Sequence, residues 1–96
     1  MSRLPLEGIR VADFTWWNAG TMATRVLANH GAQVIRVEST TRRDQIRDNT
    51  FTRPGAIGLN TSVQFNYDNP GKMSLTLNPK HPKGLEVAKR LISISD

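Results

Sequence analysis

The apolar residues between positions 9 and 38 change their spacing twice along the chain. Residues 9–14 form a short apolar run with the length of a strand, and residues 15–20 interrupt it. Residues 21–29 then repeat apolar side chains with a helical period, which predicts a helix with its apolar face at Met22, Ala23, Val26 and Leu27. Residues 33–37 are again apolar at Val34, Ile35 and Val37, which predicts a second strand.

Two strands joined by a helix must run parallel, so their carboxyl ends meet at the same edge of the sheet. We therefore expect residues 15–20 and 38–41 to be neighbours at that edge. The helix also begins there, and the free N–H groups of its first turn favour an anion. Ligands of open α/β sheets bind at this carboxyl edge.

The remaining sequence adds a third strand and a second long helix. Residues 39–67 show no sustained periodicity, and residues 66–71 (NYDNPG) are typical of a turn. Residues 73–77 alternate, which predicts a strand with Met73, Leu75 and Leu77 on its core face. A helix then begins at Pro82, with His81 as its N-cap and an apolar face at Leu85, Ala88, Leu91 and Ile92.

This pattern predicts the α/β class, with a Rossmann-like parallel sheet and flanking helices. Three strands and two helices do not cover both faces of such a sheet. We therefore expect residues 1–96 to be the amino-terminal part of something larger.

Composition narrows the functional classes. The chain has 96 residues, 38% of them hydrophobic, a formal net charge of +5 and no cysteine. The absence of cysteine excludes disulfides and thiolate metal sites, and neither His30 nor His81 has a ligand partner one helical turn away, so no metal is expected. No apolar run is long enough for a bilayer and no signal peptide is visible, so we expect a cytoplasmic protein without membrane association.

The candidate chemistry at the sheet edge favours a phosphorylated ligand. No glycine-rich dinucleotide fingerprint follows the first strand, and no nucleophile with a partner base is apparent. The strand ends instead supply amides, hydroxyls and cations, at Asn18, Ala19, Gly20, Glu38, Ser39, Arg42, Arg43, Asn78 and Lys80.

Four other residues each have a functional and a structural interpretation. Trp16 and Trp17 can stack on a ligand ring or fill the sheet edge. Asp13 can be a buried base or an acceptor of local N–H groups, of which the second is favoured. Lys72 precedes the third strand, so a solvent-exposed turn lysine is expected.

Several segments, in order, resemble the opening of the family III CoA-transferases, the group that includes formyl-CoA transferase, carnitine CoA-transferase and α-methylacyl-CoA racemase. They are residues 5–11 (PLEGIRV), 13–15 (DFT), 19–20 (AG), 27–28 (LA), 31–38 (GAQVIRVE), 71–77 (GKMSLTL) and 82–84 (PKG). The resemblance implies an interlocked homodimer that moves CoA between an acyl-CoA and a carboxylic acid. Its catalytic aspartate forms a mixed anhydride and lies beyond this chain, so the 96 residues alone are expected to be inactive.

Carried over by residue, the resemblance places CoA contacts at Asn18, Ala19, Ser39, Leu77, Asn78, Pro79 and Lys80. Some family members have Gln at the position of Asn18 and Arg at that of Ser39, so Arg42 or Arg43 is a candidate replacement cation. An acyl-CoA racemase of the same family remains open. A non-enzymatic basic module for nucleotide or nucleic acid also remains open, although the sequence lacks the interleaved basic and aromatic residues of such modules.

Overall fold

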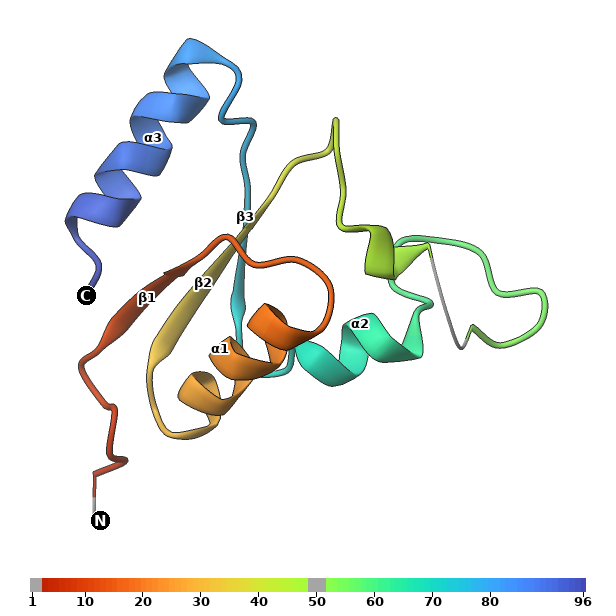
Figure 1. The fold of residues 1–96 in the computed structure, drawn as a ribbon, viewed down its shortest axis with the longest axis horizontal. Coiled ribbons are helices and arrows are strands. Elements are labelled where there is room, and N and C mark those ends of the chain that lie inside the picture. Colours follow the sequence, from red (N-terminus) through yellow and green to blue (C-terminus); the bar gives the residue numbers. More distant parts are fainter. Residues whose placement is uncertain (1–2, 49–51) are drawn as a thin grey trace.

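The computed structural model describes residues 3–48 and 52–96. Its three strands form one parallel sheet in the order β1-β2-β3 (Figure 1). They are β1 (Arg10–Asp13), β2 (Gln33–Glu38) and β3 (Met73–Thr76). The helices are α1 (Ala19–Asn29), the short 3₁₀ helix η1 (Gln45–Arg47), α2 (Val63–Asp68) and α3 (Pro82–Ser93). The predicted α/β class and parallel strand pairing are confirmed.

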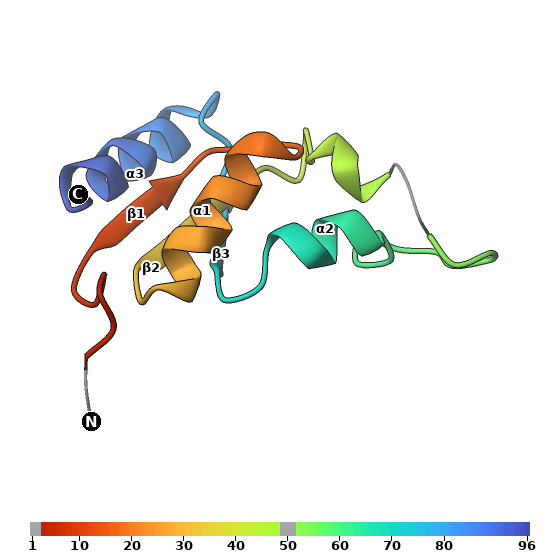
Figure 2. The ribbon, with the colours of Figure 1, turned by 60° about the horizontal axis from the view of Figure 1, so that its bottom comes forward.

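The two faces of the sheet are covered by different helices. Asp13, Arg36 and Ser74 are register partners and share one face. Thr24 of α1 donates a hydrogen bond to Asp13 there, and the Arg36 guanidinium lies 5.1 Å from the ring centroid of Phe65 in α2. α1 and α2 therefore cover this face, as Figure 2 shows.

The opposite face carries α3. Leu75 alternates with Ser74 along β3 and lines a cavity of about 320 Å³ together with Val87 and Leu91 of α3. Ala88 and Leu91 are buried, but the other two predicted face residues, Leu85 and Ile92, are exposed. Met73 is also exposed, contrary to its predicted place in the core. The described residues thus cover this face only in part.

Helix α1 buries a different face from the predicted one. Met22, Ala23 and Val26 are exposed, whereas Thr21 and Thr24 are buried. The reason is polar: Thr24 Oγ1 donates to Asp13 Oδ2 at 2.7 Å, and Thr21 Oγ1 donates to the carbonyl of Trp17. Hydrophobic periodicity cannot reveal a helix that packs on a sheet through hydroxyl groups.

Helices α2 and α3 precede and follow β3 along the chain. The short helix α2 was not predicted; it has only six residues and is capped by Ser62, whose hydroxyl accepts from Phe65 N at 3.2 Å. The predicted N-cap of α3 is confirmed, since His81 Nδ1 accepts from Lys83 N at 3.2 Å. Gly84 in the first turn of α3 has no room for a Cβ, because that atom would collide with the Asn78 carbonyl.

The end of the chain lies beside the free edge of β1 (Figure 1). Asp96 N donates to Arg10 O at 2.8 Å, and Arg10 N donates to Asp96 Oδ2 at 3.0 Å. These bonds hold the C-terminal turn of α3 against the sheet.

Candidate functional site: a cationic cleft at the strand ends

A cleft of about 580 Å³ lies at the carboxyl edge of the sheet. All three strand ends contribute to it: Trp16 follows β1, and Ser39 follows β2, while the chain after β3 reaches it from the other side. Its lining residues are Trp16, Ser39, Thr41, Arg42, Asn78, Pro79 and Lys80. The predicted proximity of these connections is therefore observed. Four residues predicted to contact ligand share this cleft, namely Ser39, Asn78, Pro79 and Lys80.

The other three predicted contacts, Asn18, Ala19 and Leu77, are not among its lining residues. Asn18 is the N-cap residue of α1, but its side chain makes no capping bond; its Oδ1 accepts from Gln64 Nε2 at 3.3 Å. Ala19 is exposed at the start of α1. Leu77 is half-buried, and its N–H donates to Glu38 O at 3.0 Å, which ties the end of β3 to β2.

The cleft is positively charged. Its lining residues include Arg42 and Lys80 but no acidic side chain, and neither cation forms an ion pair with any residue in ranges 3–48 and 52–96. The Arg42 guanidinium lies 5.6 Å from the ring centroid of Trp16, so an aromatic face and a cation stand together. Such a surface suits a ligand that carries both phosphate and a flat ring.

The two neighbouring arginines have different environments. Arg43 pairs with Asp48 and lines a separate cavity, whereas Arg42 faces the cleft. The two tryptophans also differ: Trp16 is half-buried in the cleft wall, while Trp17 is exposed and is not a lining residue. Trp17 also has a φ of 61°, the left-handed region that a bulky side chain rarely adopts.

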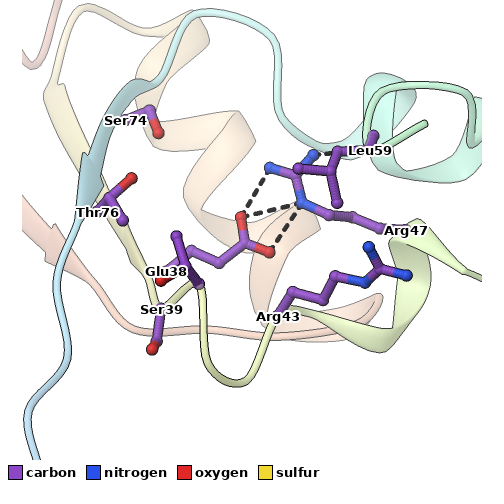
Figure 3. Close-up of a pocket in the computed structure, with 8 residues that line it drawn as sticks. Glu38, Ser39, Arg43, Arg47, Leu59, Ser74 and Thr76 are labelled. Atoms are coloured by element: carbon purple, nitrogen blue, oxygen red, sulfur yellow. Dashed lines mark hydrogen bonds and ion pairs between the residues drawn. The ribbon is translucent and has the colours of Figure 1, made fainter.

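The second cavity, of about 250 Å³, lies beside the cleft and shares Ser39 with it (Figure 3). Arg47 points at Glu38 there and donates from Nε to Oε2 at 2.8 Å and from Nη2 to Oε1 at 2.7 Å. The Asp44 N–H and Arg36 Nη1 bind the same carboxylate at 2.9 and 3.0 Å. Glu38 is one of the polar residues that the sequence places at the strand ends, but these groups already bind both of its carboxylate oxygens.

This network lowers the pKa of Glu38. Burial alone would raise the pKa, but the hydrogen bonds from Arg47 and the Asp44 N–H and the charges of Arg47 and Arg36 outweigh it. Arg47 also lies over the Phe65 ring at 3.6 Å and donates to Leu59 O at 2.7 Å. Glu38 and Arg47 thus hold the chain between β2 and α2 against the end of the sheet.

Lys72 is not a solvent-exposed turn lysine, so that expectation is wrong. Its side chain is buried, and Nζ lies 3.1 Å from Asp13 Oδ2. The same nitrogen donates to Thr21 O and to Asn69 Oδ1, each at 3.0 Å. The backbone of Lys72 does lie before β3, but its long side chain runs beneath α1 to the carboxyl end of β1.

Asp13 also receives a hydrogen bond from Thr15 N at 2.9 Å. It is therefore an acceptor of local N–H groups, which is the role that the sequence favours over a buried base. Burial would raise its pKa, but the hydrogen bonds from Thr15, Thr24 and Lys72 lower it overall. Burial lowers the pKa of Lys72, although Asp13 opposes that shift. The pair fixes the start of the loop that carries Trp16 and Trp17.

Within ranges 3–48 and 52–96, no group of three or more His, Cys, Asp or Glu side chains is arranged so that it could hold a metal ion. In that same part of the chain, no helix has both the length and the apolar content needed to span a bilayer.

Known proteins match nearly the whole chain. The model of CoA-transferase family III matches residues 6–96. Formyl-CoA:oxalate CoA-transferase of Afipia carboxidovorans is 40% identical over 91 residues, which are 95% of this chain and 20% of that protein. Succinyl-CoA:glutarate CoA-transferase of Mus musculus is 38% identical over 96 residues, 99% of this chain and 21% of that protein. The chain thus spans about a fifth of the length of these curated relatives.

Solved structures share the fold over a similar span. A hypothetical protein from Mycobacterium tuberculosis superposes with a TM-score of 0.80 at 33% identity, covering 97% of this chain and 24% of its own. A CAIB/BAIF family protein from Brucella suis gives a TM-score of 0.83 at 28% identity, covering 99% of this chain and 25% of its own. The sequence match and the shared fold agree, and the chain belongs to CoA-transferase family III.

Proposed function

We propose that the cleft at the strand ends binds CoA, and that residues 1–96 are the amino-terminal part of the CoA-binding Rossmann-like domain of a CoA-transferase. The observation that carries the proposal is the convergence of Trp16, Arg42 and Lys80 in a cleft without acidic side chains. CoA combines phosphates with an adenine ring, and these side chains complement both. The two curated relatives are named as CoA-transferases that act on formyl-CoA and succinyl-CoA, which agrees with this ligand.

In this proposal each strand end has a role. Arg42 and Lys80 contact phosphates, and Trp16 offers its ring face to the adenine. Ser39 supplies a hydroxyl where the family resemblance implies an arginine in some members, and Arg42 provides the cation from three residues further on. Asn18 and Ala19 lie at the start of α1, where backbone N–H groups favour an anion. Asn78 and Pro79 form the opposite wall, and Leu77 precedes them at the end of β3 without lining the cleft.

The proposed reaction moves CoA from an acyl-CoA to a carboxylic acid. An aspartate outside this chain attacks the thioester carbonyl, the C–S bond breaks, and CoA leaves as a thiolate while the acyl group remains as a mixed anhydride. The thiolate then attacks the aspartyl carbonyl of this anhydride, which releases the donor acid as a carboxylate and leaves an aspartyl thioester. The incoming carboxylate attacks that thioester, forms a second anhydride and frees the thiolate again. Attack of the thiolate on the acyl carbonyl of the second anhydride gives the new acyl-CoA and regenerates the aspartate. This chain holds the CoA and contributes no nucleophile. We further propose that the longer protein is a cytoplasmic homodimer, as the family resemblance implies.

Titration calorimetry with CoA and with pantetheine tests the cleft. Pantetheine lacks the phosphates and the adenine, so we expect saturable binding of CoA and no detectable binding of pantetheine. CoA affinity should fall as salt rises, because the cleft contacts are ionic. Equal binding of the two compounds would contradict the assignment. Tighter binding of a single-stranded oligonucleotide than of CoA at physiological salt would favour the nucleic-acid module instead.

Activity requires a longer protein that contains this chain. A panel of acyl-CoA donors and carboxylic acids should show exchange of CoA without exchange of the α-proton. Deuterium uptake at the α-carbon, without CoA exchange, would identify a racemase and contradict the proposed transfer.

A further inference from the structure

The loop between β1 and α1 holds one residue in a rare backbone conformation. Trp17 has a φ of 61°, in the left-handed region that an L-residue with a bulky side chain adopts only where the surrounding structure holds it. Among residues 3–48 and 52–96 it is the one non-glycine residue with a positive φ. It stands between Trp16, which lines the cleft, and Asn18, which begins α1. Its conformation therefore sets the direction in which both neighbours face.

Both polar backbone groups of Trp17 are held. The N–H lies 3.2 Å from Asp44 Oδ1 and 3.3 Å from Oδ2, and the carbonyl accepts from the Thr21 hydroxyl. Asp44 comes from the start of η1, 27 residues further along the chain. Its side chain is fully buried, so the acceptor of the hydrogen bond from Trp17 is out of contact with water.

Asp44 is itself fixed by groups that do not belong to the loop. Its carboxylate pairs with Arg36 of β2 and accepts from Ile46 N at 3.1 Å, and its own N–H donates to Glu38 Oε2 at 2.9 Å. Arg36 in the sheet and Ile46 in η1 thus orient the Asp44 carboxylate, which accepts a hydrogen bond from the backbone of the loop between β1 and α1.

We propose that Asp44 is a positioning residue of the CoA site. It does not touch the ligand; it holds Trp17 in the left-handed conformation and so preorganises the loop that presents Trp16 and Asn18. This proposal rests on the proposed CoA function for its binding readout, but its conformational readout is independent of CoA.

The conformational test is NMR of the chain without ligand. A positive φ gives a strong intraresidue N–H to Hα NOE at Trp17. Asp44→Asn keeps the size of the side chain but removes its charge, and we expect it to weaken this NOE and to lower CoA affinity about tenfold. The matched control is Asp48→Asn, because Asp48 is half-exposed, pairs with Arg43 and does not contact Trp17 in the structure. An unchanged NOE and equal affinities for the two variants would overturn the proposal.

A second pair of variants leaves Asp44 and Arg36 in place, in case Asp44→Asn fails to fold. Trp17→Gly keeps the N–H and adopts a positive φ readily, whereas Trp17→Pro removes the N–H and fixes a negative φ. Both lose the indole, so their comparison isolates the backbone. We expect Trp17→Pro to bind CoA at least tenfold more weakly than Trp17→Gly, and equal affinities would contradict the proposal. Failure of the unmodified chain to bind CoA would instead refute the proposed function and leave the NOE result to decide the role of Asp44.

Discussion

Lys72 Nζ lies 3.1 Å from Asp13 Oδ2, in an ion pair that the sheet and α1 bury almost completely. The two residues come from opposite ends of the two outer strands: Asp13 ends β1 and Lys72 precedes β3, and β2 lies between these strands. Thr24, Thr21 and Asn69 complete the hydrogen bonds of the pair. Because Asp13 also binds Thr15 N, the pair connects the packing of the sheet to the loop beside the cleft.

Removal of Lys72 should therefore be costly. Lys72→Met leaves the Asp13 carboxylate buried without its cation, and we expect a loss of about 3–5 kcal/mol in the free energy of unfolding. Urea unfolding followed by circular dichroism measures this loss. Lys89→Met is the control, because Lys89 is exposed on α3. Similar stabilities of the two variants would show that Lys72 is not buried as described.

Gly84 should control the position of Asn78. A Cβ at residue 84 collides with the Asn78 carbonyl, so Gly84→Ala must push α3 away from the turn that forms one wall of the cleft. We expect a lower melting temperature and weaker CoA binding, with the indole signal of Trp16 unchanged in the free protein. The control is Lys83→Ala, one residue earlier and exposed. Unchanged CoA affinity in Gly84→Ala would show that Asn78 is not part of the CoA site.

The sequence predicted the arrangement of the elements better than their surfaces. The spacing of apolar residues and the turn residues predicted three parallel strands and the helices α1 and α3, because both signals lie within each segment of sequence. The same signals did not predict the buried face of α1, because Thr21 and Thr24 pack through hydrogen bonds. They did not predict α2 either, because this helix has only six residues. The ion pair of Lys72 was also missed, because it depends on a side chain that runs beneath α1.

Acid should destabilise the protein through Glu38. Its pKa is lowered in the folded chain, so the unfolded chain binds the proton more readily and stability rises with pH. The contribution of Glu38 is complete above its ordinary pKa of about 4.3 and disappears as pH falls through the lowered folded value. Urea midpoints measured from pH 6 down to pH 3 (roughly the carboxylate range) should fall more steeply for the unmodified chain than for Glu38→Gln.

The control for this pH series is Glu86→Gln, because Glu86 is exposed on α3. Its midpoints should follow the pH dependence of the unmodified chain. If the midpoints of Glu38→Gln fall with pH as steeply as those of the unmodified chain and of Glu86→Gln, the bonds of Glu38 to Arg47 and Arg36 do not stabilise the fold.

A stronger N-cap should stabilise α3. His81 accepts from Lys83 N through its ring nitrogen, whereas an aspartate accepts the same bond with a negative charge at the positive end of the helix. We expect His81→Asp to raise the free energy of unfolding by roughly 0.5 kcal/mol or more. Thermal unfolding checks this, and a lower melting temperature would indicate that His81 has a further role at the cleft next to Lys80.

The site was predicted from the sequence at the level of strand ends and not of individual side chains. Parallel topology brought Ser39 and Asn78 to one edge, and that relation is observed. Which of Arg42 and Arg43 faces the cleft could not be predicted, because it depends on the pairing of Arg43 with Asp48. The role of Asp44 could not be predicted either, since nothing in its sequence neighbourhood indicates a bond to Trp17.

The most direct test of the cleft compares CoA binding to Arg42→Ala and Arg43→Ala by titration calorimetry. The two residues are adjacent and carry the same charge, but only Arg42 lines the cleft with Trp16 and Lys80. We predict that Arg42→Ala weakens CoA binding about tenfold or more, and that Arg43→Ala stays within about twofold of the unmodified chain. Equal losses, or a larger loss for Arg43→Ala, would contradict the placement of CoA in this cleft.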